Sequence, residues 1–570
     1  MEWATRGMDK PWLKHYPAGV PAELRTDACP SLVALIDEAL RAHAALPAYR
    51  FMGRAISFAQ LDEASRALAA WLQGQGLAHG DRVAIMLPNV PQYPVAVAAV
   101  LRAGMVVVNV NPMYTPRELE HQLKDSGAKA IVVLENFAAT LEPVLPAVPT
   151  RTVVLAAMGD MLGPIKGRVV NHVVRRVRKL VPSFSLPGAV RFGDAVKAGR
   201  SMAWTPASPA PDAIAVLQYT GGTTGVSKGA VLLHRNLVAN VLQSEAWYRP
   251  ALGRIPPGEQ VVTVCALPLH HIFGFTTNMM LGLRTGGCNI LIPNARDIAA
   301  LLDELSRQRF HGFPAVNTLF GAVLAHPDFD KVDWSQLKIC VGGGMAVQSA
   351  VARQWLERTG CPIVEGYGLS ETSPSVTCNP VDSPAYSGTI GLPLPGTEVA
   401  VLDDSGQPLP PGNAGEIAVR GPQVMAGYWQ RPDETARVMT ADGWLRTGDV
   451  GVMDERGQFR LVDRKKDMIL VSGFNVYPNE VEDVIAQLPG VLECAAVGVP
   501  DDRAGEIVKA VIVRRDPALS EADVRAHCEA SLTGYKRPRM IEFRDELPKS
   551  TVGKILRREL RDAGAPAQAA

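Results

Sequence analysis

The sequence predicts an α/β protein with three parts: a large N-terminal domain of parallel and mixed sheets covered by helices, a small antiparallel β part, and a small α+β domain at the C-terminus. Three observations support this class. The chain has 570 residues, more than one hydrophobic core supports. Short β-branched runs alternate with helical patterns in the first half. Past residue 390, turns become frequent and the predicted strands become short.

Strands and helices alternate from residue 83 onward. Strands are predicted at 83–87, 105–110 and 130–134, and helices at 92–102 and 116–126, the second with a proline in its first turn. This order favours a parallel sheet with helices on its faces. The same alternation predicts four further strands, at 261–266, 289–292, 339–342 and 362–365.

The last third of the chain has a different pattern. Short strands at 398–402, 415–420 and 457–462 indicate an antiparallel sheet. The charged stretch 463–468 follows, and we place the domain boundary there. The prediction is an N-terminal domain of residues 1–462, a hinge at 463–468 and a C-terminal domain of residues 469–570.

The predicted C-terminal domain begins with a helix at 479–488, where apolar residues recur at helical spacing. Asn479 is its expected N-cap, with Glu482 three residues later. Two strands are predicted after it, at 494–499 and 508–513.

Composition excludes several classes of protein. Charged residues make up 20% of the chain and hydrophobic residues 47%, as in ordinary globular proteins. The net charge of +1 gives no overall attraction to nucleic acid, so no such partner is expected. The eight cysteines are well separated and include no Cys-x-x-Cys pair. With no signal peptide or membrane-spanning run, this pattern predicts a cytoplasmic protein.

Residues 161–193 form a basic segment without Asp or Glu. On a helical wheel, six apolar residues from Val170 to Val181 fall on one side and the arginines on the other. Such a helix can lie on an anionic membrane surface. The alternative is a surface helix whose apolar stripe packs on its own domain. Peripheral contact with the inner face of the membrane therefore stays a hypothesis.

The segment from Tyr219 to Lys228 is predicted to bind phosphate. Its glycines let the backbone approach a phosphate and turn N–H groups inward, while hydroxyls and one lysine add donors. The order Ser-Lys-Gly differs from the Gly-Lys-Ser/Thr of the P-loop, which disfavours a hydrolytic nucleotidase. The predicted phosphate-binding residues are Tyr219, Thr220, Gly221, Gly222, Thr223, Thr224, Gly225, Ser227 and Lys228.

This loop resembles the phosphate signature of the adenylate-forming superfamily, which includes acyl-CoA synthetases, adenylation domains of peptide synthetases and firefly-type luciferases. The resemblance extends from about residue 20 to about residue 562 and is closest to bacterial long-chain fatty-acyl-CoA synthetases. Further matching motifs occur, in order, at residues 108–112, 267–273, 365–371, 444–449, 462–469 and 548–554.

The resemblance implies a binding site for ATP. It places adenine against the turn that contains Gly343 and Gly344, with Tyr367 stacked on the base. Asp449 would accept hydrogen bonds from the ribose hydroxyls, and Arg464 would support the same ribose. The glycines beside the stacking residue, Gly366 and Gly368, belong to the same predicted site.

The resemblance also implies a magnesium ion and a catalytic lysine. Glu371 is the expected Mg²⁺ ligand, since this ion takes one or two carboxylates plus substrate phosphates. Ser370, where the family more often has Thr, and Thr372 are candidates for phosphate contact. Lys554 would reach the active site from the C-terminal domain and, with Lys228, stabilise charge between two anions.

The two half-reactions of this family require a mobile C-terminal domain. Lys466 matches the pivot of its rotation. Gly473 would then line the passage for the pantetheine arm of coenzyme A. His271 is expected as an aromatic-type gate beside the carboxylate site, or alternatively as a core histidine.

The expected activity is conversion of a fatty acid, of long chain by resemblance, to acyl-AMP and then to acyl-CoA, with ATP, Mg²⁺ and coenzyme A. A medium-chain or aromatic acid, or the loading of a separate carrier protein, stays an alternative. Only 16 residues follow Lys554, so no attached carrier domain is expected. A homodimer is also left open.

Overall fold

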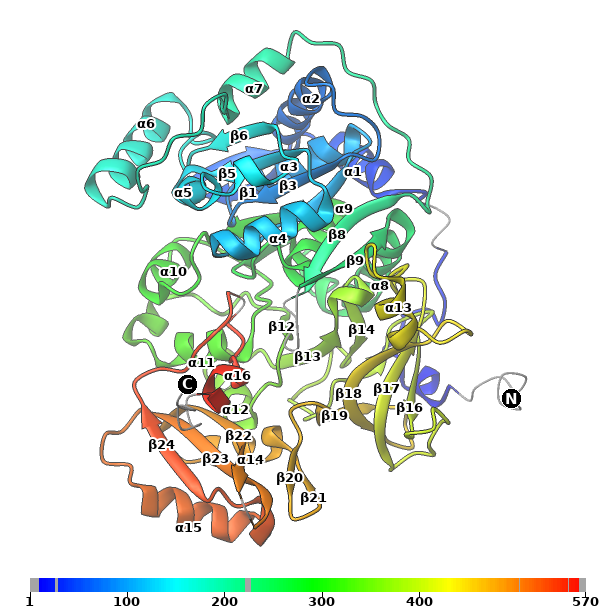
Figure 1. The fold of residues 1–570 in the computed structure, drawn as a ribbon, viewed down its shortest axis with the longest axis vertical. Helices are drawn as coiled ribbons and strands as arrows, with labels where there is room; N and C mark the ends of the chain where they lie inside the picture. The colour runs from blue at the N-terminus through cyan, green and yellow to red at the C-terminus, as the bar shows by residue number, and fades with distance from the viewer. Residues whose placement is uncertain (1–9, 26–28, 221–226, 502, 552, 563–570) are drawn as a thin grey trace.

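The structure is a computed structural model that describes residues 10–25, 29–220, 227–501, 503–551 and 553–562. It has the predicted mixed α/β architecture. Figure 1 shows the large N-terminal part above and the smaller C-terminal part, drawn in orange and red, below it.

The largest sheet has seven strands in the order β7-β6-β5-β3-β4-β8-β9. All neighbours are parallel except β8 and β9, which are antiparallel. The predicted parallel sheet is therefore confirmed, but the antiparallel edge strand was not predicted. The strands are β3 (Arg82–Met86), β4 (Val106–Asn109), β5 (Ala130–Leu134), β6 (Thr152–Ala156), β7 (Val190–Arg191), β8 (Ile214–Thr220) and β9 (Lys228–Leu233).

Two four-stranded sheets lie beside it. The first has the order β10-β11-β1-β2 and the second β12-β13-β14-β15. Parallel pairing of β12 with β13 brings the glycine turn after β12 next to the Glu-Gly-Tyr-Gly stretch. The strands are β1 (Pro47–Phe51), β2 (Arg54–Ser57), β10 (Val262–Cys265), β11 (Cys288–Leu291), β12 (Cys340–Gly342), β13 (Ile363–Gly368), β14 (Ser375–Cys378) and β15 (Leu392–Pro393).

Helices surround these sheets. The first two predicted helices coincide with α3 and α4, and α4 has a complete capping box between Thr115 and Glu118. The helices are α1 (Leu32–Ala42), α2 (Phe58–Gly74), α3 (Gln92–Arg102), α4 (Pro116–Ser126), α5 (Ala138–Leu141), α6 (Pro164–His172), α7 (Phe192–Gly199), α8 (His234–Leu252), α9 (Leu281–Thr285), α10 (Ile298–Leu305), α11 (Asn317–Ala325), α12 (Ser349–Thr359) and α13 (Pro432–Val438).

The predicted antiparallel part is a four-stranded sheet in the order β16-β17-β18-β19. Its last pair sets Asp449 directly opposite Arg464. The strands are β16 (Glu398–Leu402), β17 (Ala414–Arg420), β18 (Leu445–Met453) and β19 (Phe459–Arg464).

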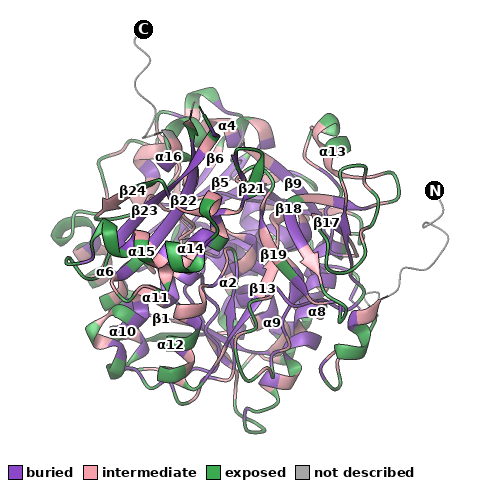
Figure 2. Ribbon diagram, turned by 90° about the horizontal axis from the view of Figure 1, so that it is seen from below, coloured by how far each residue is buried: buried purple, intermediate pink, exposed green. Residues whose placement is uncertain are grey.

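The C-terminal part has its own sheet and a separate hydrophobic core between Ile469 and Leu560. Figure 2 shows β22 and β23 largely buried, while α15 turns an exposed face outward. Its elements are β20 (Ile469–Val471), β21 (Phe474–Val476), α14 (Pro478–Ala486), β22 (Val491–Asp501), β23 (Gly505–Arg514), α15 (Glu521–Ser531), β24 (Met540–Arg544) and α16 (Arg557–Asp562).

The predicted N-cap of the first C-terminal helix is wrong. The N-cap of α14 is Tyr477, because Pro478 occupies the first helical position, where a missing N–H is tolerated. Asn479 therefore lies inside the helix. Its side-chain amide donates instead to the carbonyl of Val462, at 3.4 Å.

The basic segment is a short helix, α6, followed by a π-helical turn at Val173–Val177. Val174 is buried and Val170 packs on the core of the N-terminal part. Val177 and Leu180, predicted for the same face, are instead 64% and 56% exposed, since the wider turn rotates them outward. Within the described residues, no helix has the length and apolar character needed to cross a membrane.

Candidate active site

A cavity of about 2250 Å³ lies between the N-terminal sheets and the C-terminal domain, and both line it. It gathers residues that are more than 300 positions apart in the chain. The predicted site residues in its wall are Tyr219, Thr220, Lys228, His271, Gly343, Gly344, Gly366, Tyr367, Gly368, Ser370, Glu371, Asp449, Arg464, Lys466 and Lys554.

The base of the phosphate loop is a pair of antiparallel strand ends. Thr220 ends β8 directly opposite Lys228, the first residue of β9. The Tyr219 hydroxyl donates to Asp125 at 2.7 Å, and the Ser227 hydroxyl donates to the carbonyl of Thr220 at 2.6 Å. These bonds fix both ends of the loop. The predicted loop residues Gly221, Gly222, Thr223, Thr224 and Gly225 lie outside the described residues.

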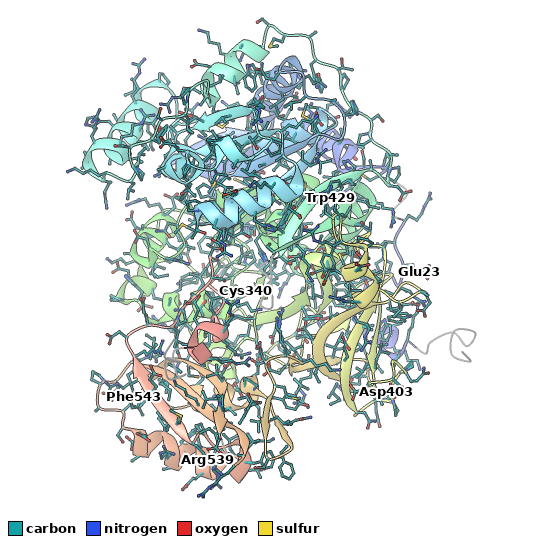
Figure 3. All side chains as sticks on the ribbon, in the orientation of Figure 1. Glu23, Cys340, Asp403, Trp429, Arg539 and Phe543 are labelled. Carbon is teal, nitrogen blue, oxygen red and sulfur yellow. The ribbon has the colours of Figure 1, made fainter. Side chains whose placement is uncertain are left out.

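Trp429 forms two hydrogen bonds beside the base of this loop. Its backbone N–H donates to the carbonyl of Gly229 at 2.8 Å, and its indole N–H donates to that of Asp125 at 3.0 Å. Figure 3 labels Trp429 between the large sheet and the antiparallel sheet. The segment around residue 429 thus connects two sheets at the phosphate-binding end of the cavity.

Lys228 and Glu371 are linked through Tyr428. The Lys228 ammonium forms an ion pair with Glu434 and lies 5.3 Å from the centre of the Tyr428 ring. The Tyr428 hydroxyl donates to Glu371 at 2.8 Å. The predicted phosphate cation and the predicted metal ligand therefore share one aromatic neighbour, on the same side of the cavity.

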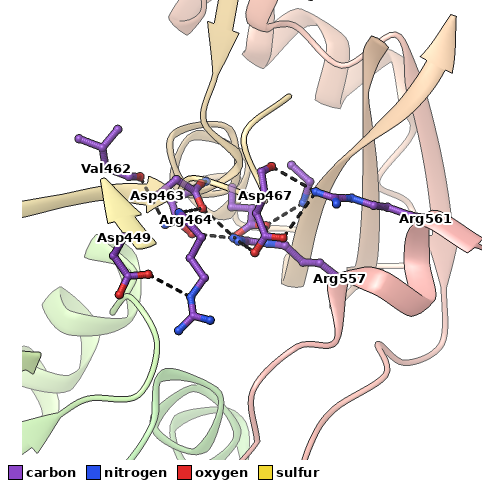
Figure 4. Close-up of polar contacts among 10 residues, drawn as sticks. Asp449, Val462, Asp463, Arg464, Asp467, Arg557 and Arg561 are labelled. Atoms are coloured by element: carbon purple, nitrogen blue, oxygen red, sulfur yellow. Dashed lines mark hydrogen bonds and ion pairs between the residues drawn. The ribbon is translucent and has the colours of Figure 1, made fainter. Parts of the chain in front are cut away.

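Asp449 is the centre of a second polar group. It is only 2% exposed. The Tyr367 hydroxyl donates to Asp449 at 2.7 Å, and the Arg464 guanidinium lies 3.2 Å from its other oxygen. Figure 4 shows the contact with Arg464. A carboxylate held on both oxygens has a fixed orientation, which suits recognition of a vicinal diol.

The glycines of the predicted adenine site stand where a side chain would collide. A Cβ on Gly343 would lie 3.0 Å from the ring of Phe273, and one on Gly368 would lie 1.9 Å from the carbonyl of Pro374. Gly344 has a φ of +80°, which favours glycine. At Gly343 and Gly368 the backbone therefore packs so closely against Phe273 and Pro374 that a side chain would not fit.

His271 is a neutral side chain at physiological pH. Burial, and then the nearby charge of Lys554, lower its pKa to about 4. The adjacent His270 has a pKa lowered to about 3, chiefly by burial. A neutral imidazole in the cavity wall can contact the carboxylate of a bound acid without forming an ion pair with it.

The wall of the cavity fits a magnesium ion through one carboxylate. Across the described residues, there is no group of three or more His, Cys, Asp or Glu side chains that would hold a metal. Glu371 stands at the cavity wall beside Ser370. Such a site suits Mg²⁺, which usually keeps waters and takes its remaining ligands from substrate phosphates.

Lys554 enters the cavity from the C-terminal domain, on a loop that contacts the N-terminal part. The Thr318 hydroxyl donates to the carbonyl of Gly553 at 2.9 Å, and Arg296 donates to that of Ser550 at 3.0 Å. Burial, and then the charge of Arg464, lower the Lys554 pKa to about 7. A lysine from one domain thus faces an aspartate-tyrosine pair from the other.

Comparison with known proteins agrees with this geometry. The AMP-binding enzyme family matches residues 36–429, and the AMP-binding enzyme C-terminal domain matches residues 480–554. This chain belongs to the AMP-binding enzyme family. The two matches lie on either side of the predicted hinge.

Relatives cover almost the whole chain of this AMP-binding enzyme. It is similar to the long-chain-fatty-acid–CoA ligase of Escherichia coli O6:H1, with 54% identity over 97% of this chain and 98% of that protein. The crystal structure of the anthranilate CoA ligase AuaEII with anthranoyl-AMP has a TM-score of 0.83 and 27% identity, covering 95% of this chain and 99% of that one. ATP-bound MatB from Rhodopseudomonas palustris has a TM-score of 0.78 and 30% identity, covering 94% and 99%.

Three predicted residues of the AMP-binding site are outside the cavity wall. The Thr372 hydroxyl is buried and bonded to the backbone of Leu369 and Pro374. Ser227 bonds across the loop base, as described above. Gly473 lies in the turn of the β20–β21 hairpin, with a φ of +84° and no atom within 4 Å of an added Cβ. In this arrangement of the domains it faces away from the cavity.

Sequence reasoning missed two residues of the AMP-binding site. Tyr428 and Glu434 follow no motif. Tyr428 lines the cavity and Glu434 pairs with Lys228, because residues 421–438 cross from the antiparallel sheet to the phosphate loop. Only the tertiary arrangement reveals their roles.

Proposed function

We propose that this protein is a long-chain fatty-acid–CoA ligase, which forms acyl-AMP from a fatty acid and ATP and then transfers the acyl group to coenzyme A. The observation that carries this proposal is the position of Lys554. A cation from the C-terminal domain stands in the same cavity as Asp449, Glu371 and Lys228 of the N-terminal domain. An enzyme that only binds nucleotide has no need for a cation delivered in this way.

In the first half-reaction, a carboxylate oxygen of the acid bonds to the α-phosphorus of ATP, and the bond to pyrophosphate breaks. Asp449 and Tyr367 orient the nucleoside. Lys554 lowers the repulsion between the two anions and stabilises the charge that develops between them. Lys228 leaves Glu434 to contact the pyrophosphate oxygens. Glu371 would hold Mg²⁺, which would neutralise charge on the phosphates.

In the second half-reaction, the thiol of coenzyme A attacks the acyl carbonyl, and AMP leaves with the electrons of the broken bond. We propose that the C-terminal domain, residues 469–570, rotates for this step about Lys466, in a hinge at 463–468, relative to residues 1–462. The separate core beyond residue 469 supports rotation as a unit. Rotation would bring Gly473 to the pantetheine passage.

A long acyl tail has room beside His271. Apolar and small residues line that end of the cavity, among them Phe273, Val316 and Gly343. A second, smaller cavity shares the wall residues Tyr248 and Val341 with it. Each buried methylene contributes about 0.8 kcal/mol, so an apolar site that takes up more of the chain favours longer acids. Phe275 and Phe320 are fully buried and are not part of this wall.

The test is a panel of acids from short to long chains, including an aromatic acid, supplied with ATP, Mg²⁺ and coenzyme A. We expect AMP and acyl-CoA, with kcat/KM rising with chain length. ADP as a product would contradict the adenylate mechanism. A preference for aromatic or medium-chain acids would support the alternative substrates, and transfer to a carrier protein but not to coenzyme A would support a carrier-loading enzyme.

A variant separates the two half-reactions. Lys554→Ala should abolish acid-dependent exchange of pyrophosphate into ATP, because the bridging cation is lost. It should still convert supplied acyl-AMP and coenzyme A to acyl-CoA. An equal loss in both halves would contradict the assignment of Lys554 to the first half.

We also propose peripheral contact with an anionic membrane through residues 164–181. Ile165 and Val169 are 79% and 57% exposed and, with Val177 and Leu180, give this segment an apolar surface. Arg176, Arg178 and Lys179 are exposed beside it. Exposed apolar and cationic side chains together are what an interfacial helix presents to lipid.

Vesicle sedimentation tests this contact. Replacing Arg176, Arg178 and Lys179 by Gln should reduce binding to vesicles with anionic lipid and leave binding to neutral vesicles unchanged. Arg175 is kept, because it pairs with the buried Glu135. Equal binding by both proteins would contradict the proposal. A cytoplasmic location stays our prediction. A homodimer stays an open alternative, which the molecular mass from light scattering would test.

A further inference from the structure

A buried ionic cluster joins the hinge to the C-terminal helices. Asp463, at the end of β19, is fully buried. The backbone N–H of Asn479 donates to one of its oxygens at 2.9 Å, and the Arg557 guanidinium lies 3.4 Å from the other. Figure 4 shows Asp463, Asp467, Arg557 and Arg561 together. These two partners come from the C-terminal domain, while the backbone N–H of Arg464, on the same strand, also donates to Asp463 at 2.7 Å.

Arg557 is held firmly within its own domain. It donates to Glu482 at 3.0 and 2.8 Å and to the side chain of Asn479 at 2.6 Å. It follows Lys554 by three residues, at the first position of α16. The position of Arg557 is therefore coupled to the position of Lys554.

Some contacts of this cluster join residues on opposite sides of the pivot at Lys466, and others join residues on the same side. Asp463 precedes the pivot, so its contacts with Asn479 and Arg557 must change when the domain rotates. Asp467 follows the pivot, so its ion pairs with Arg557 at 3.8 Å and Arg561 at 3.6 Å can rotate with the domain. The two carboxylates contact the same arginine but lie on opposite sides of the pivot.

We propose that Asp463 and Arg557 form a latch that holds the C-terminal domain in the adenylate-forming orientation. They are positioning residues that place Lys554 for the first half-reaction and are not needed for the second. This inference rests on the proposed two-step function. Asp463 also lines the cavity, so water can solvate its carboxylate when the latch opens.

The ion pair between Asp463 and Arg557 selects one orientation of the domains and does not increase the stability of the fold. Burial raises the pKa of Asp463 even though Arg557 opposes the shift, so the charged pair is formed against a desolvation penalty. A buried pair of this kind adds little net stability over apolar packing, but it is satisfied in a single arrangement. Such a contact selects one orientation of two domains.

The experiment uses full-length protein and measures the halves separately: acid-dependent pyrophosphate exchange, and conversion of supplied acyl-AMP with coenzyme A. Asp463→Asn keeps the size and hydrogen-bonding oxygen of the side chain and removes its charge. We expect exchange to slow by about tenfold, the effect of losing one charge-assisted contact, with thioester formation within about twofold of wild type. The control is Asp467→Asn, expected to change the two halves equally or not at all.

Arg557→Met and the double variant with both Asp463→Asn and Arg557→Met complete a double-mutant cycle. If the latch is one unit, the double variant should exchange no more slowly than Arg557→Met alone. Parallel loss of both halves in Asp463→Asn, or an unchanged rate of exchange in that variant, would overturn the latch. A selective loss of exchange in Asp467→Asn as large as that in Asp463→Asn would overturn it as well. Failure of the wild-type protein to make acyl-AMP would instead overturn the proposed function.

Discussion

In the proposed mechanism, the first half-reaction depends on the charge of a single lysine, Lys554. In the nucleotide-free protein, the Lys554 pKa is lowered to about 7, mainly by burial and then by Arg464. Its ordinary value is about 10.4. The lysine is therefore cationic below pH 7 and increasingly neutral above it. Near pH 7, Lys554 is therefore only partly protonated before ATP and the acid bind. The proposed mechanism places this lysine between these two anions.

This makes the first half-reaction sensitive to pH. We expect kcat/KM for ATP in pyrophosphate exchange to fall as pH rises through about 7, since this parameter reports ionisations of the free enzyme. Exchange assays from pH 6 to 9 measure it, with thioester formation from supplied acyl-AMP as the control. A flat profile over this range would contradict the prediction.

In the nucleotide-free protein, Glu434 forms an ion pair with the Lys228 ammonium. A phosphate of ATP has to displace Glu434 before it can bind this lysine. Replacing Glu434 by Gln should therefore lower KM for ATP, by roughly twofold to fivefold, the effect of one partly exposed ion pair. Asp433→Asn, on the same helix, is the matched control. Initial rates against ATP concentration at low ionic strength measure the change. A higher KM in Glu434→Gln would show that Glu434 supports ATP binding.

At the scale of elements, the sequence predicted what depends on local pattern. Helices α3 and α4 and strands β5 and β16 have the predicted bounds, because apolar periodicity and capping residues specify them. Strand β9 was missed since local pattern does not reveal its antiparallel pairing with β8. The wider turn at Val173–Val177 was missed because periodicity at 3.6 residues cannot reveal a local π-helix.

Strand β13 carries a buried carboxylate that links stability to pH. Burial raises the Glu365 pKa to about 8, from an unperturbed value of about 4.3. The folded protein therefore holds a proton that the unfolded chain releases, so stability falls as pH rises between these two values. The slope is at most about 1.4 kcal/mol per pH unit.

Glu365→Gln should remove that dependence. The amide oxygen can still accept the Val347 N–H, which the carboxylate accepts at 3.1 Å. Thermal unfolding at pH 5.5 and 7.5 should show a smaller difference in the variant than in the wild-type protein. Glu357→Gln, an exposed position on α12, is the control. An unchanged difference would mean that the carboxyl titrates normally.

For the whole molecule, the motifs predicted which residues form the site but not how the two domains meet. Asp449 and Lys554 are identified by their motifs, yet their meeting depends on one orientation of the C-terminal domain. Two contacts join the domains in this orientation, Thr318 with Gly553 and Asp463 with Arg557. The motifs contain Gly553 and Asp463 but do not reveal which residue each of them contacts. Contacts between distant surfaces cannot be deduced from local periodicity.

Occupation of the cavity should stabilise the assembled domains together. A non-hydrolysable acyl-adenylate analogue at 100 times its Kd should add about 2.7 kcal/mol of stability. It should also slow tryptic cleavage at Lys465 and Lys466, which are exposed in the hinge. Thermal shift and timed digestion measure both effects. Equal cleavage with and without the analogue would contradict closure of the cavity by both domains.

The cavity needs both domains to be complete, and the proposed mechanism moves one of them between the two half-reactions. In that mechanism the enzyme cannot hold all its reactants in productive positions at one moment. A domain rotation displaces solvent, so we expect added viscosogen to slow saturated turnover, and an unchanged rate would show that the rotation does not limit it.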